Sequence, residues 1–117
     1  MTTGILYLVR FYNAEIEFLK FGITNNADYE IRTKQQLRTA KRHDLCYNYE
    51  YLYISALQDG VKVYDTEQYI RLHTKIYDRV PKSLFPDGYT ETVSIDALYP
   101  ILLILDQQLG ESILNID

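Results

Sequence analysis

Tryptophan is absent from the 117-residue chain, and cysteine and methionine each occur once. The single cysteine, Cys46, excludes an intramolecular disulfide framework and a zinc site built from several thiolates. The longest apolar run, residues 97–105, is about half as long as a membrane-spanning helix. The first four residues also lack the basic region of a secretory signal and lead directly into an expected strand. These absences lead us to expect a small cytoplasmic domain that does not enter a membrane.

Several common catalytic motifs are missing as well. The chain has neither a Gly-x-Ser-x-Gly turn nor a Gly-x-x-x-x-Gly-Lys loop, which argues against hydrolases with a nucleophile elbow and against P-loop proteins. No metal-binding run stands out, because the two histidines, His43 and His73, are thirty residues apart and there is a single cysteine. We therefore expect His73 to be a packed core residue rather than a ligand.

Tyrosine and an uneven charge distribution are what the sequence does contain. There are 12 tyrosines, whose rings pack on one side and offer a hydroxyl on the other. The net charge of −4 argues against a protein that coats nucleic acid. Residues 31–43 nevertheless contain no acid, and this strip could contact a phosphate backbone. The basic residues of the strip are Arg32, Lys34, Arg38, Lys41 and Arg42.

Hydrophobic periodicity and turn residues predict seven elements in the order β-β-α-β-α-β-α. The expected ranges are strands 5–11, 17–24 and 47–56, a helix 27–41, a helix 66–79, a strand 90–93 and a helix 95–109. The first two strands are expected to form a hairpin. The 47% hydrophobic content supports one core. We therefore predict a single α+β domain over residues 1–117, with a small central antiparallel or mixed sheet flanked by helices.

Three local patterns sharpen these expectations. The alternation in 47–56 predicts that its four tyrosines (47, 49, 51 and 53) share one side of the strand. Asp65 followed by Gln68 resembles a capping box, which would place Glu67 in the first turn of its helix. The final helix carries a leucine-rich stripe, and we expect residues 95–109 to serve a homodimer or a protein partner if the core leaves part of the stripe uncovered.

An ordered set of short motifs runs through these elements. Ile5-Leu6-Tyr7 lies on the first expected strand, Lys20-Phe21-Gly22 on the second, Arg32 on the following helix and Glu67 on a later one, before residues 88–91. In this order and spacing, the chain resembles the GIY-YIG nuclease superfamily. It is most similar to the small phage and bacterial branch, in which the second signature reads Lys-aliphatic-Gly. The resemblance covers residues 4–93 and includes the fifteen-residue separation of Tyr7 and Gly22.

The resemblance implies metal-dependent hydrolysis of phosphodiester bonds in DNA, with RNA as a further possibility. Glu67 would bind Mg²⁺ or Mn²⁺, and Tyr7 would act as general base or orient the attacking water. Lys20 replaces the second tyrosine and would supply a cation beside Tyr7. Arg32 would bind the scissile phosphate, with Arg38 as an alternative because Arg32 lies ten residues after Gly22. The other basic residues, Lys34, Lys41 and Arg42, would follow the nucleic-acid backbone together with Arg38.

Two positions depart from the superfamily pattern. Gln36 stands where many members carry histidine or tyrosine, and Thr90 and Glu91 stand where many carry a late asparagine. A different class of function therefore stays open beside the nuclease: a catalytically silent domain of the same fold that binds nucleic acid or another protein. A steep loss of affinity with salt would indicate nucleic acid, whereas salt-insensitive association through residues 95–109 would indicate a protein.

Overall fold

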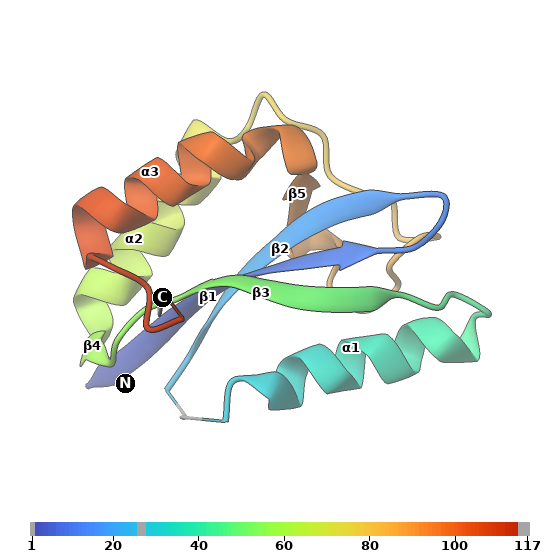
Figure 1. The fold of residues 1–117 in the computed structure, drawn as a ribbon, viewed down its shortest axis with the longest axis horizontal. Helices are drawn as coiled ribbons and strands as arrows, with labels where there is room; N and C mark the ends of the chain where they lie inside the picture. The colour runs from blue at the N-terminus through green and yellow to red at the C-terminus, as the bar shows by residue number, and fades with distance from the viewer. Residues whose placement is uncertain (1, 26–27, 115–117) are drawn as a thin grey trace.

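The computed structural model describes residues 2–25 and 28–114, which form a central sheet with helices on both sides (Figure 1). The strands are β1 (Thr3–Tyr12), β2 (Glu17–Thr24), β3 (Asn48–Ile54), β4 (Gln58–Asp59) and β5 (Thr92–Ser94). The helices are α1 (Glu30–Arg42), α2 (Gly60–His73) and α3 (Leu98–Leu109), with short 3₁₀ turns at η1 (Tyr89–Glu91) and η2 (Ile95–Ala97). The predicted α+β class is confirmed, and the short β4 is an addition to the expected order.

The sheet is antiparallel throughout and is built around the predicted hairpin. Its strand order is β3-β1-β2-β5, and β4 pairs with the start of β1. In the hairpin, Tyr7 lies directly opposite Gly22. The hairpin therefore brings the two sequence signatures side by side at one level of the sheet.

The two faces of the sheet bury different side chains. On the first face, which we call the α2–α3 face, aliphatic residues of both helices pack on the sheet. Its most buried members include Leu6, Leu8, Leu19, Val63, Ile70, Ile101 and Leu105. On the second face, which we call the α1 face, aromatic rings dominate. Its members include Tyr7, Phe11, Phe18 and Phe85, with Tyr29, Tyr47, Tyr49 and Tyr51 packed around them.

The expectation that all four tyrosines of β3 share one side is wrong for Tyr53. Tyr51 pairs with Val9 and Tyr53 with Leu8, so Leu52 is an extra residue that produces a bulge. Tyr53 consequently turns to the α2–α3 face, whereas Tyr47, Tyr49 and Tyr51 stay on the α1 face. A single inserted residue reverses the side of every residue that follows it, because the side-chain period of a strand is two.

Helix α2 begins six residues earlier than the capping-box pattern predicts. Asp59, not Asp65, is its N-cap, and the Asp59 side chain accepts hydrogen bonds from the backbone amides of Val61 and Lys62. Glu67 therefore lies in the middle of the helix, outside the first turn. The helix ends at His73 rather than Arg79.

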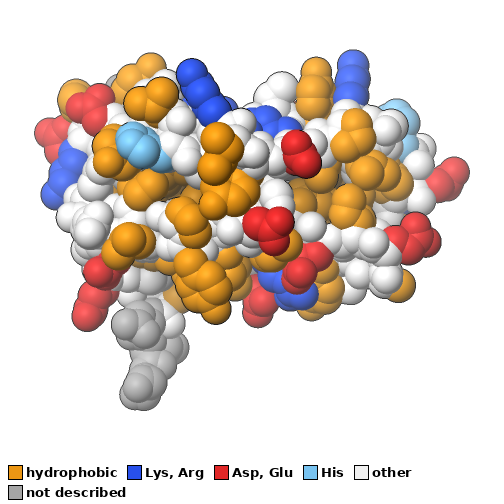
Figure 2. Space-filling view, turned by 90° about the horizontal axis from the view of Figure 1, so that it is seen from above, with side chains coloured by type: hydrophobic (Ala, Val, Ile, Leu, Met, Phe, Trp, Pro, Cys, Tyr) orange, Lys and Arg blue, Asp and Glu red, His pale blue; other side chains and the backbone are white. Residues whose placement is uncertain are grey.

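The expectation that His73 is a packed core residue is also wrong. Val63, Thr66 and Ile70 are buried, whereas Tyr69, Leu72 and Ile76 are exposed, and His73 is an exposed residue whose ring stacks on Tyr69. Val63, Thr66 and Ile70 are spaced three and four residues apart, so they share the helix face that is buried. The space-filling view shows apolar side chains among charged ones on the side of the molecule that carries α2 and α3 (Figure 2).

The first and last helices follow their predicted ranges closely. Helix α1 begins at Glu30, and the expected start at residue 27 lies outside the described residues. Ser94 caps the η2 turn, through a bond from the Asp96 amide, and α3 follows it. The apolar stripe of α3 is largely used in the core, which leaves Tyr99 and Leu103 exposed. Within residues 2–25 and 28–114, no helix is long and apolar enough to cross a membrane.

Candidate active site

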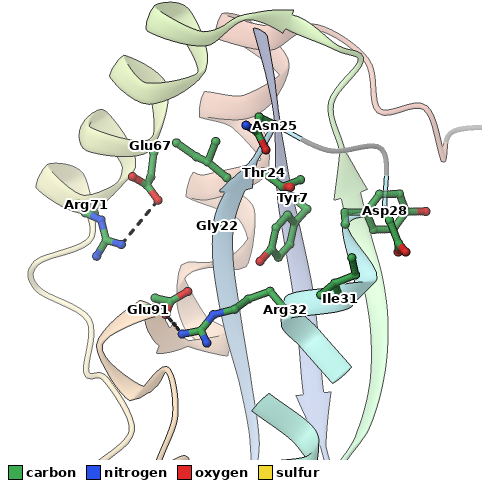
Figure 3. A pocket seen from close by; sticks show the side chains of 12 residues that line it. Tyr7, Gly22, Thr24, Asn25, Asp28, Ile31, Arg32, Glu67, Arg71 and Glu91 are labelled. Carbon is green, nitrogen blue, oxygen red and sulfur yellow. Dashed lines mark hydrogen bonds and ion pairs between the residues drawn. The ribbon is translucent and has the colours of Figure 1, made fainter. Parts of the chain in front are cut away.

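A cleft of about 600 Å³ lies where strand β2 extends beyond its neighbour β5. Strand β5 pairs with Phe18–Lys20 alone, so the later part of β2 is uncovered by β5 on that edge. Helix α2 approaches this edge from one side of the sheet and α1 from the other (Figure 3). Three of the predicted catalytic residues, Tyr7, Arg32 and Glu67, line the cleft together with Gly22.

Tyr7 is a buried side chain fixed by its neighbours in the hairpin. Its ring lies over Gly22, where an added Cβ would be 2.8 Å from the hydroxyl Oη and 3.0 Å from Cζ. Lys20 Nζ donates a hydrogen bond of 2.7 Å to Tyr7 Oη. Gly22 is therefore needed because only hydrogen leaves room for the tyrosine ring.

Burial disfavours the charged forms of both Tyr7 and Lys20. Lys20 is fully buried, and this burial lowers its pKa to about 8, although the nearby Glu91 carboxylate partly offsets the effect. Burial also raises the pKa of Tyr7 well above its usual value, and the negative charge of Glu91 adds to the rise. The phenol is therefore protonated at neutral pH. Lys20 changes its charge close to neutral pH.

Arg32 projects from α1 into the cleft and is held by two carboxylates. Its guanidinium lies 3.0 Å from Asp87 Oδ1 and 3.2 Å from Glu91 Oε2. Burial acts to lower the pKa of Arg32, but the charges of Glu91 and Asp87 outweigh it and raise the pKa above normal. The side chain is still 43% exposed. It can therefore reach a ligand in the cleft while remaining fully charged.

Glu67 faces the cleft from α2, where Arg71 lies one turn further along the helix. The Glu67 carboxylate is 3.6 Å from the Arg71 guanidinium and only 13% exposed. Burial raises the pKa of Glu67 despite the opposing charge of Arg71. A cation in the cleft would stabilise this carboxylate in its ionised form.

The carboxylate that the cleft offers as a metal ligand suits a hard cation that keeps most of its bound water. Within the described residues, no group of three or more His, Cys, Asp or Glu side chains is placed to hold a metal ion. Mg²⁺ needs only one or two carboxylates in addition to water and substrate phosphate. Glu67 offers such a carboxylate at the wall of an open cleft. The residues present therefore fit the ion that the sequence led us to expect.

Glu91 is the main site residue that sequence reasoning missed. It is 3.6 Å from Lys20 Nζ, pairs with Arg32, and accepts a bond of 3.5 Å from Gln36 Nε2. Glu91 thus connects the cation behind Tyr7 with the arginine at the cleft. Its position in a short turn gave no periodic signal. Asp87 escaped notice for the same reason, whereas Arg71 could have been found from its i, i+4 spacing to Glu67.

Gln36 and Arg38 do not present their side chains to the cleft in the way that the superfamily pattern would require. Gln36 is fully buried, and its amide lies against Gly88, which has a φ of +113° and no room for a Cβ. Gln36 Oε1 has no hydrogen-bond partner among the described residues. Arg38 lies with Lys41 and Arg42 at a separate surface depression, so the alternative role of Arg38 at the cleft is wrong.

The remaining basic residues form an exposed strip along α1. Lys34 is 3.4 Å from Glu30 one turn earlier, and Arg42 donates a bond to Thr39 Oγ1. Lys41 and Arg38 are also exposed. The positions of these four side chains are compatible with contacts to a phosphate backbone, which stays a prediction.

Comparisons with known proteins add no relative from which a role could be transferred. No protein-family model matches the chain, no curated protein is similar to it, and no solved structure matches its fold. The functional argument therefore rests on the cleft and its residues.

Proposed function

We propose that this protein is a metal-dependent endonuclease that hydrolyses phosphodiester bonds, with DNA as its first substrate and RNA as the alternative. The observation that carries the proposal is the meeting of Tyr7, Arg32 and Glu67 in one cleft. These residues come from β1, α1 and α2, and 60 positions separate Tyr7 from Glu67 in the sequence. The sequence motifs alone identify these three residues, and all three line the same cleft.

Each residue has a role that its surroundings support. Arg32 binds the scissile phosphate, because a guanidinium presents several donors to phosphate oxygens and keeps its charge. Glu67 holds Mg²⁺ or Mn²⁺, which when bound supplies Lewis-acid stabilisation of the phosphate. Tyr7 orients the attacking water through its hydroxyl.

Lys20 gives Tyr7 a route for the proton of the attacking water. With a pKa of about 8, a substantial fraction of Lys20 is neutral in mildly basic solution and can accept the proton of Tyr7 across the 2.7 Å contact. Tyr7 in turn accepts a proton from water. This relay requires neutral Lys20, so the cleavage rate is expected to rise with pH to a plateau above about pH 8.

A second candidate function is favoured by the contacts of Arg32. Its guanidinium already pairs with Asp87 and Glu91, and these pairs must loosen before it can grip a phosphate. A domain in which they stay closed would be a catalytically silent module that binds nucleic acid or a protein. Binding without cleavage would identify this alternative.

The test is cleavage of supercoiled plasmid by purified protein with Mg²⁺ or Mn²⁺, alongside Glu67→Gln and Tyr7→Phe. Glu111→Gln and Tyr53→Phe are matched controls, because Glu111 is exposed and neither residue lines the cleft. We expect the parent and both controls to cut, and both cleft variants to lose activity. Equal cutting by all five proteins would point to a contaminant, and no cutting by the folded parent would favour the silent module.

The proposal includes a cellular setting. DNA is available in the cytoplasm of a bacterial or phage-infected cell, which we take as the expected location. Substrate choice in this setting would depend on the exposed basic strip of α1 and on a homodimer or protein partner through residues 95–109. The basic strip and α3 lie on opposite sides of the sheet (Figure 1). Substitutions in one should therefore leave the contacts of the other intact.

A further inference from the structure

The cleft is lined by charged side chains and by apolar ones. Arg32 and Arg71 line it together with Glu67 and Glu91, whereas Ile23, Tyr29 and Ile31 line it near the end of β2 and the start of α1. Figure 3 shows Arg71 on the α2 side and Ile31 on the α1 side, with Tyr7 between them. A ligand that fills this cleft therefore meets both guanidinium groups and apolar side chains.

Tyr29 and Ile31 break the local rules for the start of a helix. Tyr29 occupies the N-cap position of α1 but makes no side-chain capping bond, although Ser, Asp or Asn would stabilise the helix there. Ile31 is 46% exposed in the first turn. Apolar residues that give up local stability and face a cleft are typical of a ligand-binding surface.

The aromatic ring of Tyr29 is held in place. It contacts the ring of Tyr51 edge-on, with centroids 5.0 Å apart at 77°. Tyr51 in turn donates a hydrogen bond of 2.8 Å to Thr33 Oγ1 on α1. A rigid ring offers a stacking surface whose ordering cost is already met before a ligand arrives.

Arg71 is positioned by contacts that leave its donors available. Its guanidinium lies 3.6 Å from Glu67, 3.5 Å from the Thr90 carbonyl oxygen, and 5.2 Å from the centre of the Phe21 ring. These long contacts orient the group without saturating its five N–H donors. Arg71 can therefore add a second phosphate contact to that of Arg32.

We propose that the cleft binds one unpaired nucleotide, with its phosphate at Arg32 and Arg71 and its base against Tyr29 and Ile31. The inference rests on the proposed phosphodiester substrate of the same cleft. A volume of about 600 Å³ is in the range of small-molecule pockets and does not admit a double helix. A base reaches an aromatic side chain only when it is unstacked, as in single strands, loops or flipped nucleotides. The preferred substrate is therefore single-stranded or locally unpaired nucleic acid.

The test measures binding without divalent cations, so that no strand is cut. The probes are a short fluorescent single-stranded DNA, the same strand with abasic positions, and its fully paired duplex. We expect the parent to bind the single strand about tenfold more tightly than either of the other probes, because base stacking on an aromatic side chain contributes this much. Tyr29→Phe should keep this preference, and Ile31→Ser and Tyr29→Ala should each lose most of it.

Matched controls separate the cleft from general surface effects. Tyr64→Ala and Ile76→Ser change exposed residues outside the cleft and should bind like the parent. Ile31→Ser is an exposed substitution, so it keeps the test valid even if Tyr29→Ala fails to fold. Arg71→Met retains packing on Phe21 and should reduce the salt dependence of binding by about one phosphate contact, whereas Lys75→Met, an exposed change outside the cleft, should reduce it less.

Equal affinity for the three probes would overturn the inference, as would unchanged probe preference in both Tyr29→Ala and Ile31→Ser. If the parent cuts duplex plasmid in a Glu67-dependent way but shows no probe preference, the inference fails and the nuclease stands. If the parent prefers the single strand but cuts no substrate with metal, the nuclease fails and the nucleotide site stands. An absence of binding to all three probes would overturn the nucleotide site, and the plasmid assay with metal would then decide the nuclease separately.

Discussion

The α2–α3 face and the α1 face of the sheet are buried to a similar degree but with different chemistry. On the α2–α3 face, the buried polar groups include Thr66 and Thr74, and both donate to carbonyl oxygens of α2. The α1 face buries Lys20, Thr33 and Gln36 among aromatic rings. The first face is therefore arranged for stability, whereas the second retains groups that are costly to bury.

The difference explains why the cleft lies where the two faces meet at the edge of β2. Tyr7 and Lys20 belong to the α1 face, whereas Glu67 and Arg71 extend from α2 on the other side. The α2–α3 face supports α2 by packing Val63 and Ile70 on the sheet, which fixes Glu67 relative to Tyr7. Five substitutions test this division of roles, from the largest expected effect to the smallest.

Leu105→Ala should have the largest effect on stability, because Leu105 is fully buried in the α2–α3 face. Removing its branched end leaves a cavity, with an expected loss of about 2–5 kcal/mol in the free energy of unfolding. Urea denaturation measures the change. A loss of under about 0.5 kcal/mol would contradict the view that this face is a tightly packed core.

Lys20→Met should raise the free energy of unfolding, whereas Leu105→Ala lowers it, although the two side chains are equally buried. At pH 7, replacing the buried charge by an apolar chain of similar length should stabilise the protein by about 1–3 kcal/mol while abolishing cleavage. The folded-state pKa of about 8 lies below the usual 10.5, so above pH 8 the unfolded state binds more protons than the folded state. The stability of the parent therefore rises with pH toward that of the variant.

Urea titrations of both proteins between pH 7 and 9.5 measure this convergence. A constant difference across the range would mean that Lys20 does not titrate there. A destabilised Lys20→Met protein would mean that the contacts of Lys20 with Tyr7 and Glu91 outweigh its burial.

Gly22→Ala should disturb the pair of signatures at the cleft. The added Cβ would meet Tyr7 Oη at 2.8 Å, so the ring must shift, with an expected loss of about 1–3 kcal/mol in stability and of most activity. The same substitution in a Tyr7→Phe background should destabilise less, because the closest atom is gone. Equal stability losses in the two backgrounds would contradict a contact with the hydroxyl.

Tyr51→Phe and Tyr53→Phe compare one small change on the two faces. Tyr51 donates to Thr33 Oγ1, and Tyr53 donates to the Gly110 carbonyl oxygen at 2.7 Å. Each variant should lose about 1 kcal/mol of stability. Only Tyr51→Phe should also weaken activity, because the hydroxyl bond to Thr33 fixes a ring that packs edge-on against Tyr7, with centroids 6.0 Å apart. A larger activity loss in Tyr53→Phe would reverse the proposed roles of the faces.

The sequence predicted the features that depend on neighbouring residues. Strand-forming runs around a turn predicted the hairpin, and the spacing of Tyr7 and Gly22 agrees with their observed pairing. The start of α2 was mispredicted because Asp59 and Asp65 both precede helix-compatible residues, and local pattern alone does not choose between them. The side of Tyr53 depends on a bulge opposite β1, which the β3 sequence does not reveal.

The sequence predicted only those site residues that belong to short motifs. Tyr7, Lys20, Arg32 and Glu67 belong to short motifs, and all except the buried Lys20 line the cleft. Glu91 and Asp87 become visible only when the turn before β5 is placed against α1. Contacts between residues more than fifty positions apart, such as Arg32 and Glu91, depend on the whole fold.

The central claim is that Tyr7 and Glu67 act together on one phosphodiester. The most direct test is single-turnover cleavage by Tyr7→Phe, Glu67→Gln and the double variant. If the residues act as a unit, the double variant should be about as slow as the slower single variant. Rate losses that multiply in the double variant would show independent effects and would contradict the claim.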